Sequence, residues 1–125
     1  RVILDTTENA FYNFFVKEDI KIDYLHIDAG HSYDDVKKDF TLYSSILSDY
    51  GVISIHDTDE SFEKELIVTE DVKEKRHHTP FDGPSKLIKE LKESNEWELF
   101  NFFNNGVMKE KPSTTGLTLL QRCRI

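Results

Sequence analysis

The pattern of hydrophobic and polar residues is clearest between residues 22 and 58. Two short apolar runs, residues 24–27 and 52–55, are interrupted only by His26 and Ser54. Runs this short, apolar on both faces and separated by one helical pattern, are typical of parallel strands buried inside a sheet. The segment therefore predicts a β-α-β unit within an α/β fold.

The linking helix is predicted to begin at Ser32, which can cap it together with Asp35 three residues on. One apolar stripe follows at positions i, i+4, i+7 and i+11 and is expected to pack on the sheet: Val36, Phe40, Tyr43 and Leu47. We expect the helix to end at residues 49–51, where Gly51 suits a turn with positive φ.

Weaker patterns flank this unit. Residues 2–4 are a short strand candidate, and a capped helix follows with an apolar face made by Phe11, Phe14 and Phe15. Pro84 suits the first turn of a later helix whose buried face would consist of Leu87, Ile88 and Leu91. Residues 97–103 and 116–122 then predict an antiparallel pair of strands.

Residues 59–83 are highly charged and show little periodicity. Such a segment is expected to be either an exposed insertion or a lid beside a site, since long loops in compact domains are often functional. His77 and His78 within it are expected to face solvent.

Composition narrows the class of protein. The 125 residues suffice for one domain with one core, and the net charge of −8 argues against nucleic acid or an anionic membrane as the main partner. A single cysteine, Cys123, permits no internal disulfide and suits a cytoplasmic location. No apolar run approaches the roughly 20 residues that a membrane helix needs.

Four ionisable residues lie where the two central strands end: Asp28, His31, His56 and Asp57. Parallel strands bring their carboxyl ends to one edge of a sheet, so these side chains are expected to be neighbours. Asp28, His56 and Asp57 would suit a divalent cation, or they could form an ion pair of aspartate and histidine without any metal. His26, in mid-strand, is expected to be buried and hydrogen-bonded.

The stretch IDYLHIDAGHSYDDVKKDF, followed by GVISIHDT, resembles the second half of a class I S-adenosylmethionine-dependent methyltransferase. The resemblance is to the bacterial metal-dependent O-methyltransferase branch, which is related to the catechol and macrolide sugar O-methyltransferases. It implies the C-terminal part of a Rossmann-like three-layer sandwich, with a mostly parallel sheet closed by an antiparallel C-terminal hairpin.

The same resemblance assigns roles to residues. His31 would be the catalytic base, and Asp5, Thr6 and Asp28 would lie at the S-adenosylmethionine site. Asp28, His56 and Asp57 would hold a divalent metal, either magnesium or manganese. The imidazole of His56 departs from the all-oxygen sites of the family, which disfavours magnesium. The acceptor would be a hydroxyl of a small molecule or a sugar.

The Gly-rich loop and the acidic ribose-binding residue of the family are not found in the sequence. We therefore expect a truncated domain with poor affinity for the cofactor. The strand at residues 24–27 would lack its usual neighbour, which favours self-association through an exposed sheet edge or filling of the gap by residues 2–4. Two other functions stay open: a non-catalytic fragment that only folds or associates, and a metal-dependent hydrolase using Asp28, His56 and Asp57.

Overall fold

The computed structural model describes residues 1–59, 82–102 and 116–124. Its helices and strands follow in the order α1 (Thr7–Ala10), η1 (Phe11–Val16), β1 (Ile22–Ile27), α2 (Tyr33–Ser44), β2 (Leu47–His56), α5 (Gly83–Ser94), β3 (Trp97–Phe102) and β4 (Leu117–Arg122). The predictions for the charged segment after Asp59, including those for His77 and His78, fall outside the described residues.

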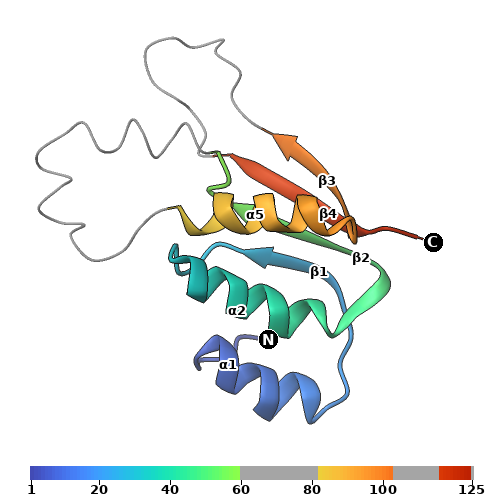
Figure 1. The fold of residues 1–125 in the computed structure, drawn as a ribbon. Helices are drawn as coiled ribbons and strands as arrows, with labels where there is room; N and C mark the ends of the chain where they lie inside the picture. The colour runs from blue at the N-terminus through green and yellow to red at the C-terminus, as the bar shows by residue number, and fades with distance from the viewer. Residues whose placement is uncertain (60–81, 103–115, 125) are drawn as a thin grey trace, which may run out of the picture.

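The strands form one sheet in the order β1-β2-β4-β3 (Figure 1). β1 pairs in parallel with β2, while β4 lies between β2 and β3 and is antiparallel to both. Strands β1, β2 and β3 therefore point the same way. The predicted fold class is confirmed: a central parallel β-α-β unit is followed by an antiparallel C-terminal pair.

Helices α2 and α5 pack side by side over one face of this sheet (Figure 1). Between the helices and the sheet lies one hydrophobic core, in which Ile53, Ile55 and Leu120 are completely buried. The predicted helix stripes are confirmed, because the following residues are all buried: Val36, Phe40, Tyr43, Leu87, Ile88 and Leu91. Within the described residues no helix has the length and apolar content needed to cross a membrane.

The predicted end of the linking helix was wrong. Helix α2 ends at Ser44, and Leu47 already belongs to β2, where it pairs with Ile22 of β1. Leu47 is buried, and a buried leucine is equally typical of a helix packed on a sheet and of a central strand. The apolar pattern therefore could not separate the end of the helix from the start of β2. Gly51 lies within β2 without a positive φ. Glycine is required here because a side chain would not fit: a Cβ at this position would lie 2.5 Å from Cγ of Leu47.

The strand predicted at residues 2–4 is also absent. Val2 and Leu4 are 84% and 94% exposed, and this segment pairs with none of the described strands. A run of three residues gains strand geometry only by pairing its backbone with a neighbour. The adjacent Arg1 instead places its guanidinium 4.6 Å from the centre of the Phe14 ring of η1.

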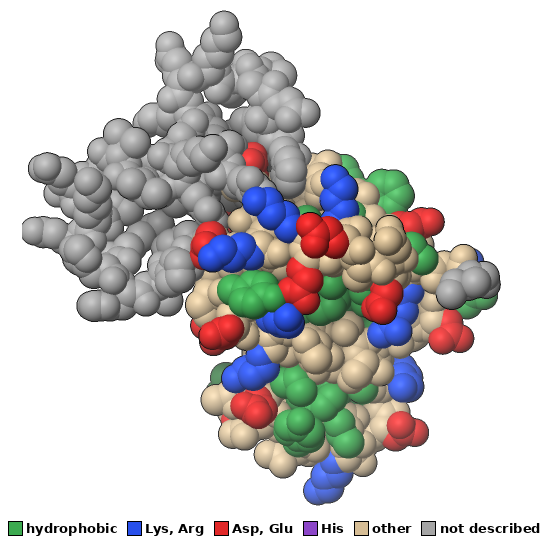
Figure 2. Space-filling model, in the orientation of Figure 1, with side chains coloured by type: hydrophobic (Ala, Val, Ile, Leu, Met, Phe, Trp, Pro, Cys, Tyr) green, Lys and Arg blue, Asp and Glu red, His purple; other side chains and the backbone are tan. Residues whose placement is uncertain are grey.

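A polar contact joins the outer surfaces of α2 and α5. Figure 2 shows Lys and Arg interspersed with Asp and Glu over this side of the molecule. Lys37 donates to both carboxylate oxygens of Glu90, at 2.9 and 3.1 Å, and the Tyr33 hydroxyl donates to the same carboxylate. The hydrogen bonds from Tyr33 and then Lys37 lower the pKa of Glu90, and hydrogen bonds to Tyr33 and Glu90 raise that of Lys37.

We expect Glu90→Gln to cause a small loss of thermal stability that depends on pH. Because the pKa of Glu90 is lowered in the folded state, its stabilising effect is present above the ordinary carboxyl value of 4.5. It disappears as the pH falls through the lower folded value. Melting curves should therefore separate the variant from the parent at neutral pH and converge in acid. Equal separation at both pH values would contradict the pairing.

Candidate functional site

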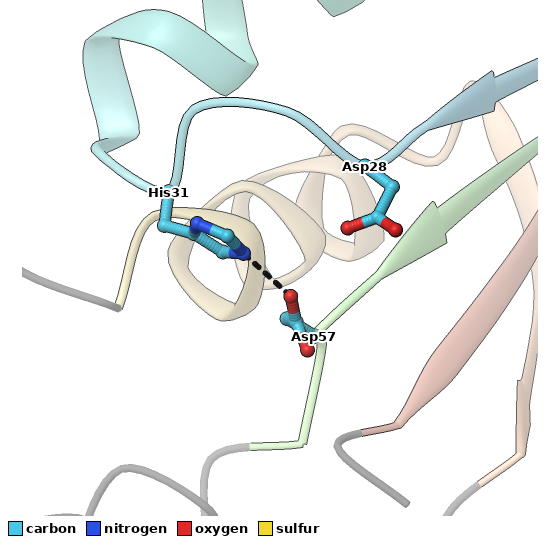
Figure 3. Close-up of side chains that lie close together, drawn as sticks. All are labelled: Asp28, His31 and Asp57. Carbon is cyan, nitrogen blue, oxygen red and sulfur yellow. Dashed lines mark hydrogen bonds and ion pairs between the residues drawn. The ribbon is translucent and has the colours of Figure 1, made fainter.

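Two parallel strands bring acidic residues to one edge of the sheet. Asp28 directly follows β1 and Asp57 directly follows β2, and the last paired residues of the two strands are Ile27 and Ile55. His31 lies on the turn between β1 and α2. Figure 3 shows its ring directed at the Asp57 carboxylate, with the Asp28 carboxylate facing the same space. One ligand atom from each of Asp28, His31 and Asp57 lies within 4.8 Å of the other two.

Asp57 stands at the centre of this cluster. Its Oδ2 lies 2.5 Å from Nε2 of His31, and its Oδ1 lies 3.0 Å from Nδ1 of His56. The side chain is only 12% exposed, so one carboxylate is held between two imidazoles in partial shelter from water. The same Nδ1 of His56 lies 3.8 Å from Oδ1 of Asp28. All four predicted residues therefore meet at this edge.

The backbone of Asp57 has a positive φ of 59°, which few residues other than glycine adopt. Its N–H donates to the carbonyl of Gly116 at 2.9 Å, which ties the end of β2 to the start of β4. Next to it, Thr58 is buried and accepts a hydrogen bond from the Thr118 hydroxyl at 2.8 Å. These contacts hold the carboxylate in its unusual position.

Asp5 and Thr6, two of the predicted site residues, accept hydrogen bonds from backbone N–H groups at the N-terminus of α1. Thr6 caps that helix by accepting from the N–H of Asn9 at 3.2 Å. Oδ1 of Asp5 accepts from the N–H of Thr6 at 2.8 Å. These hydrogen bonds confirm the predicted cap, while contact of Asp5 and Thr6 with a cofactor stays a prediction.

The expectation for His26 was only half right. The side chain is hydrogen-bonded as predicted, with Nδ1 2.7 Å from the hydroxyl oxygen of Ser54, but the residue is exposed. It lies on the sheet face opposite α2 and α5, because Leu25 and Ile27 point toward those helices.

Gly83 supports the turn that carries His31, a role that no pattern in the sequence predicted. The N–H of Gly83, at the start of α5, donates to the carbonyl of His31 at 3.1 Å. A Cβ on Gly83 would lie 2.3 Å from that carbonyl oxygen and 2.4 Å from the carbonyl carbon of Ser32. In the sequence, Pro84 predicted only a helix start, and Gly83 was the last residue of the charged segment 59–83. Neither signal carries information on what packs against Gly83.

Gly83→Ala is expected to destabilise the fold by about 1–3 kcal/mol, since the new methyl group meets backbone atoms that cannot move aside freely. It should also displace His31 from Asp57. Chemical denaturation would measure the first effect, and histidine NMR shifts the second. Ser85→Ala, two residues further along the same helix, is a control that adds no volume. Unchanged stability and unchanged His31 shifts in Gly83→Ala would contradict this close packing.

The cluster has the donor chemistry of a cation site. It offers carboxylate oxygens from two aspartates and imidazole nitrogens from two histidines. Magnesium favours oxygen ligands, whereas manganese, iron and zinc accept an imidazole beside carboxylates. The residues present therefore suit a divalent transition metal better than magnesium. The same groups also form an aspartate–histidine ion pair at His31 and Asp57.

All four residues of this cluster lie within a range that matches a known domain family. The first 58 residues match a methyltransferase domain family. The matched range includes β1, α2 and β2, and with them Asp28, His31, His56 and Asp57. Among curated protein sequences no significant relative was found.

Two solved structures share the fold. A Staphylococcus aureus protein assigned as a caffeoyl-CoA O-methyltransferase aligns with 98% of this chain at a TM-score of 0.64 and 15% identity. The complex of M1.HpyAVI with SAM aligns with 96% of this chain at a TM-score of 0.55 and 11% identity. The chain spans about half the length of these proteins, 51% and 52%. The methyltransferase domain match covers residues 1–58, and the two solved structures show the fold that this chain shares with them.

Proposed function

We propose that this chain is the C-terminal part of an S-adenosylmethionine-dependent O-methyltransferase that acts on a hydroxyl of a small molecule or sugar. The observation that carries the proposal is the convergence of Asp28, His31 and Asp57 at the ends of two parallel strands, inside the segment that matches the methyltransferase domain. In an open α/β sheet this edge is where ligands bind.

His31 is the proposed base. An imidazole can accept a proton near neutral pH, and the Asp57 carboxylate 2.5 Å away would both orient the ring and stabilise the cation that forms. The acceptor hydroxyl would lose its proton to His31 as its oxygen bonds to the methyl carbon. When bound, S-adenosylmethionine would supply that methyl group through cleavage of its bond from sulfur to methyl, which would leave a neutral thioether.

Asp28, His56 and Asp57 are the proposed cation ligands. The Nδ1 atom of His56 lies 3.0 Å from Oδ1 of Asp57 and 3.8 Å from Oδ1 of Asp28. The residues whose ligand atoms all lie within 4.8 Å of one another are Asp28, His31 and Asp57, so His56 would join the ion from the rim of that set. A bound divalent cation would make an acceptor hydroxyl more acidic. Asp57 contacts both imidazoles, and its carboxylate therefore links the proposed base to the proposed ligands.

Asp5, Thr6 and Asp28 are the proposed contacts to S-adenosylmethionine. Helices α1 and α2 begin on the same side of the molecule as the carboxyl ends of β1 and β2 (Figure 1). The N-terminal turn that contains Asp5 and Thr6 therefore lies on the same side as the aspartate–histidine cluster. This arrangement supports a cofactor lying along that edge.

The test is transfer of a labelled methyl group from S-adenosylmethionine to a panel of catechol and sugar hydroxyls, assayed with the intact protein that carries this chain. We expect transfer that increases with added manganese and falls with a chelator. No binding of S-adenosylmethionine by that protein would overturn the proposal. Metal-dependent cleavage of an acceptor in the absence of any methyl donor would instead favour a hydrolase. Two aspartates and an imidazole can also activate metal-bound water.

A further inference from the structure

The turn that carries Asp57 is fixed by a strand that comes much later in the chain. The methyltransferase match ends at residue 58, whereas β4 begins at Leu117. Gly116, just before β4, accepts from the N–H of Asp57 at 2.9 Å. Gly116 has a φ of 87°, and a Cβ on it would lie 2.6 Å from the backbone nitrogen of Asp59. The turn and the start of β4 are therefore in direct backbone contact.

Thr118 of β4 reaches the same turn with its side chain. It pairs with Ile55 of β2 on one side and with Asn101 of β3 on the other. Thr118 is completely buried, and Thr58, the residue after Asp57, is 2% exposed. Their hydroxyl oxygens lie 2.8 Å apart. This contact gives the Thr58 hydroxyl the hydrogen-bond partner that a buried polar group needs.

Asn101 holds the Thr118 hydroxyl from the neighbouring strand. Oδ1 of Asn101 lies 2.7 Å from Oγ1 of Thr118. A threonine has few favourable rotamers about χ1, so two partners suffice to fix the direction of its hydroxyl. Asn101 is exposed, in contrast to the two buried threonines. A chain of three polar side chains thus connects β3, through β4, to the residue next to Asp57.

The Asp57 carboxylate is sensitive to this chain because its backbone has an uncommon conformation. A φ of 59° is unfavourable for a residue with a side chain and persists only where neighbouring contacts hold it. In that conformation Oδ2 lies 2.5 Å from Nε2 of His31, and Oδ1 lies 3.0 Å from Nδ1 of His56. A shift of the Thr58 backbone would rotate the carboxylate relative to both imidazoles.

We propose that Thr118 is a positioning residue of the aspartate–histidine cluster. Its hydrogen bond to Thr58 sets the direction of the Asp57 carboxylate, and Asn101 sets the direction of the Thr118 hydroxyl. Residues that orient metal ligands commonly change metal affinity without touching the ion. Thr118 therefore affects both the proposed base, His31, and the proposed cation site. For that consequence the inference rests on the proposed function.

Two substitutions of Thr118, made in the intact protein that carries this chain, test the proposal. Thr118→Val keeps the shape of the side chain and removes the hydroxyl, whereas Thr118→Ser keeps the hydroxyl. Because a carboxylate only accepts hydrogen bonds, the His31 ring donates an N–H to Asp57. Measured without metal, the downfield proton NMR signal of this N–H should be present in the parent and in Thr118→Ser and lost in Thr118→Val.

Manganese affinity is the second readout. It should fall about tenfold in Thr118→Val and stay within about twofold of the parent in Thr118→Ser. Asn101→Ala changes an exposed residue, so this variant should fold and lose part of the same affinity. Ser44→Ala is the matched control. It removes another buried hydroxyl, at the end of α2 away from His31, and should change neither readout.

The proposal fails if Thr118→Val keeps both the His31 signal and the manganese affinity of the parent. If Thr118→Val does not fold, Asn101→Ala decides, and parental values of both readouts in that variant overturn the proposal. A parent protein that binds no manganese would count against the proposed cation site instead. The His31 signal needs no metal and would still show whether Thr118 positions Asp57.

Discussion

Replacing Ile53 with alanine is expected to destabilise the fold by about 2–5 kcal/mol. Ile53 is completely buried in β2, where it pairs with Leu25 of β1 and Leu120 of β4. Because strands enclose it on both sides and helices lie above it, the structure cannot collapse to fill the space that the lost side chain leaves. A loss of this size is a large fraction of the roughly 5–15 kcal/mol that stabilises an ordinary domain.

Denaturant titration followed by circular dichroism measures this loss. Ile53→Val, which removes one methyl group, should cost about 0.5–1.5 kcal/mol. Phe100→Ala removes a larger side chain from a position that is 58% exposed and should cost less than Ile53→Ala. If Phe100→Ala proved the more damaging variant, the face of the sheet covered by α2 and α5 would not be the core.

His31→Ala is expected to lower the rate of methyl transfer by about 10²–10⁴-fold, the usual contribution of a positioned base. The physical reason is the loss of the proton acceptor that Asp57 holds at 2.5 Å. The effect should appear in kcat, since the proton moves in the transition state while acceptor binding uses other groups. The measurement is steady-state kinetics with the intact protein that carries this chain.

A control variant and a manganese titration test whether the loss of rate comes from the missing base. His26→Ala removes another imidazole of β1, which contacts Ser54 and meets the cluster only through the ring of His56, 6.4 Å away between centroids, and it should leave the rate within a few-fold of the parent. Manganese titration separates the roles of His31: a base leaves metal affinity nearly intact, whereas a ligand lowers it together with the rate. An unchanged rate in His31→Ala would remove this residue from the proposed mechanism.

Local signals in the sequence were enough to predict the β-α-β unit. The cap at Ser32, the stripe of Val36, Phe40 and Tyr43, and the two short apolar runs each depend on neighbours within a few residues. Chain order then placed Asp28 and Asp57 at the same edge, because parallel strands joined by one helix must point the same way.

Other features depended on contacts between distant residues. Only the pairing of Leu47 with Ile22 shows that β2 begins before Gly51. Only the sheet order shows that residues 2–4 pair with none of the described strands.

The sequence by itself therefore determined the central β-α-β unit and which polar residues follow its strands. The tertiary structure decided how those residues face one another: Asp57 takes a positive φ, bonds to the backbone of Gly116 and comes to lie between His31 and His56. It also decided that Gly83 supports the turn at His31. The physical reason is that periodicity and capping arise from neighbours along the chain, whereas side-chain orientation at a strand end depends on packing between segments far apart in sequence.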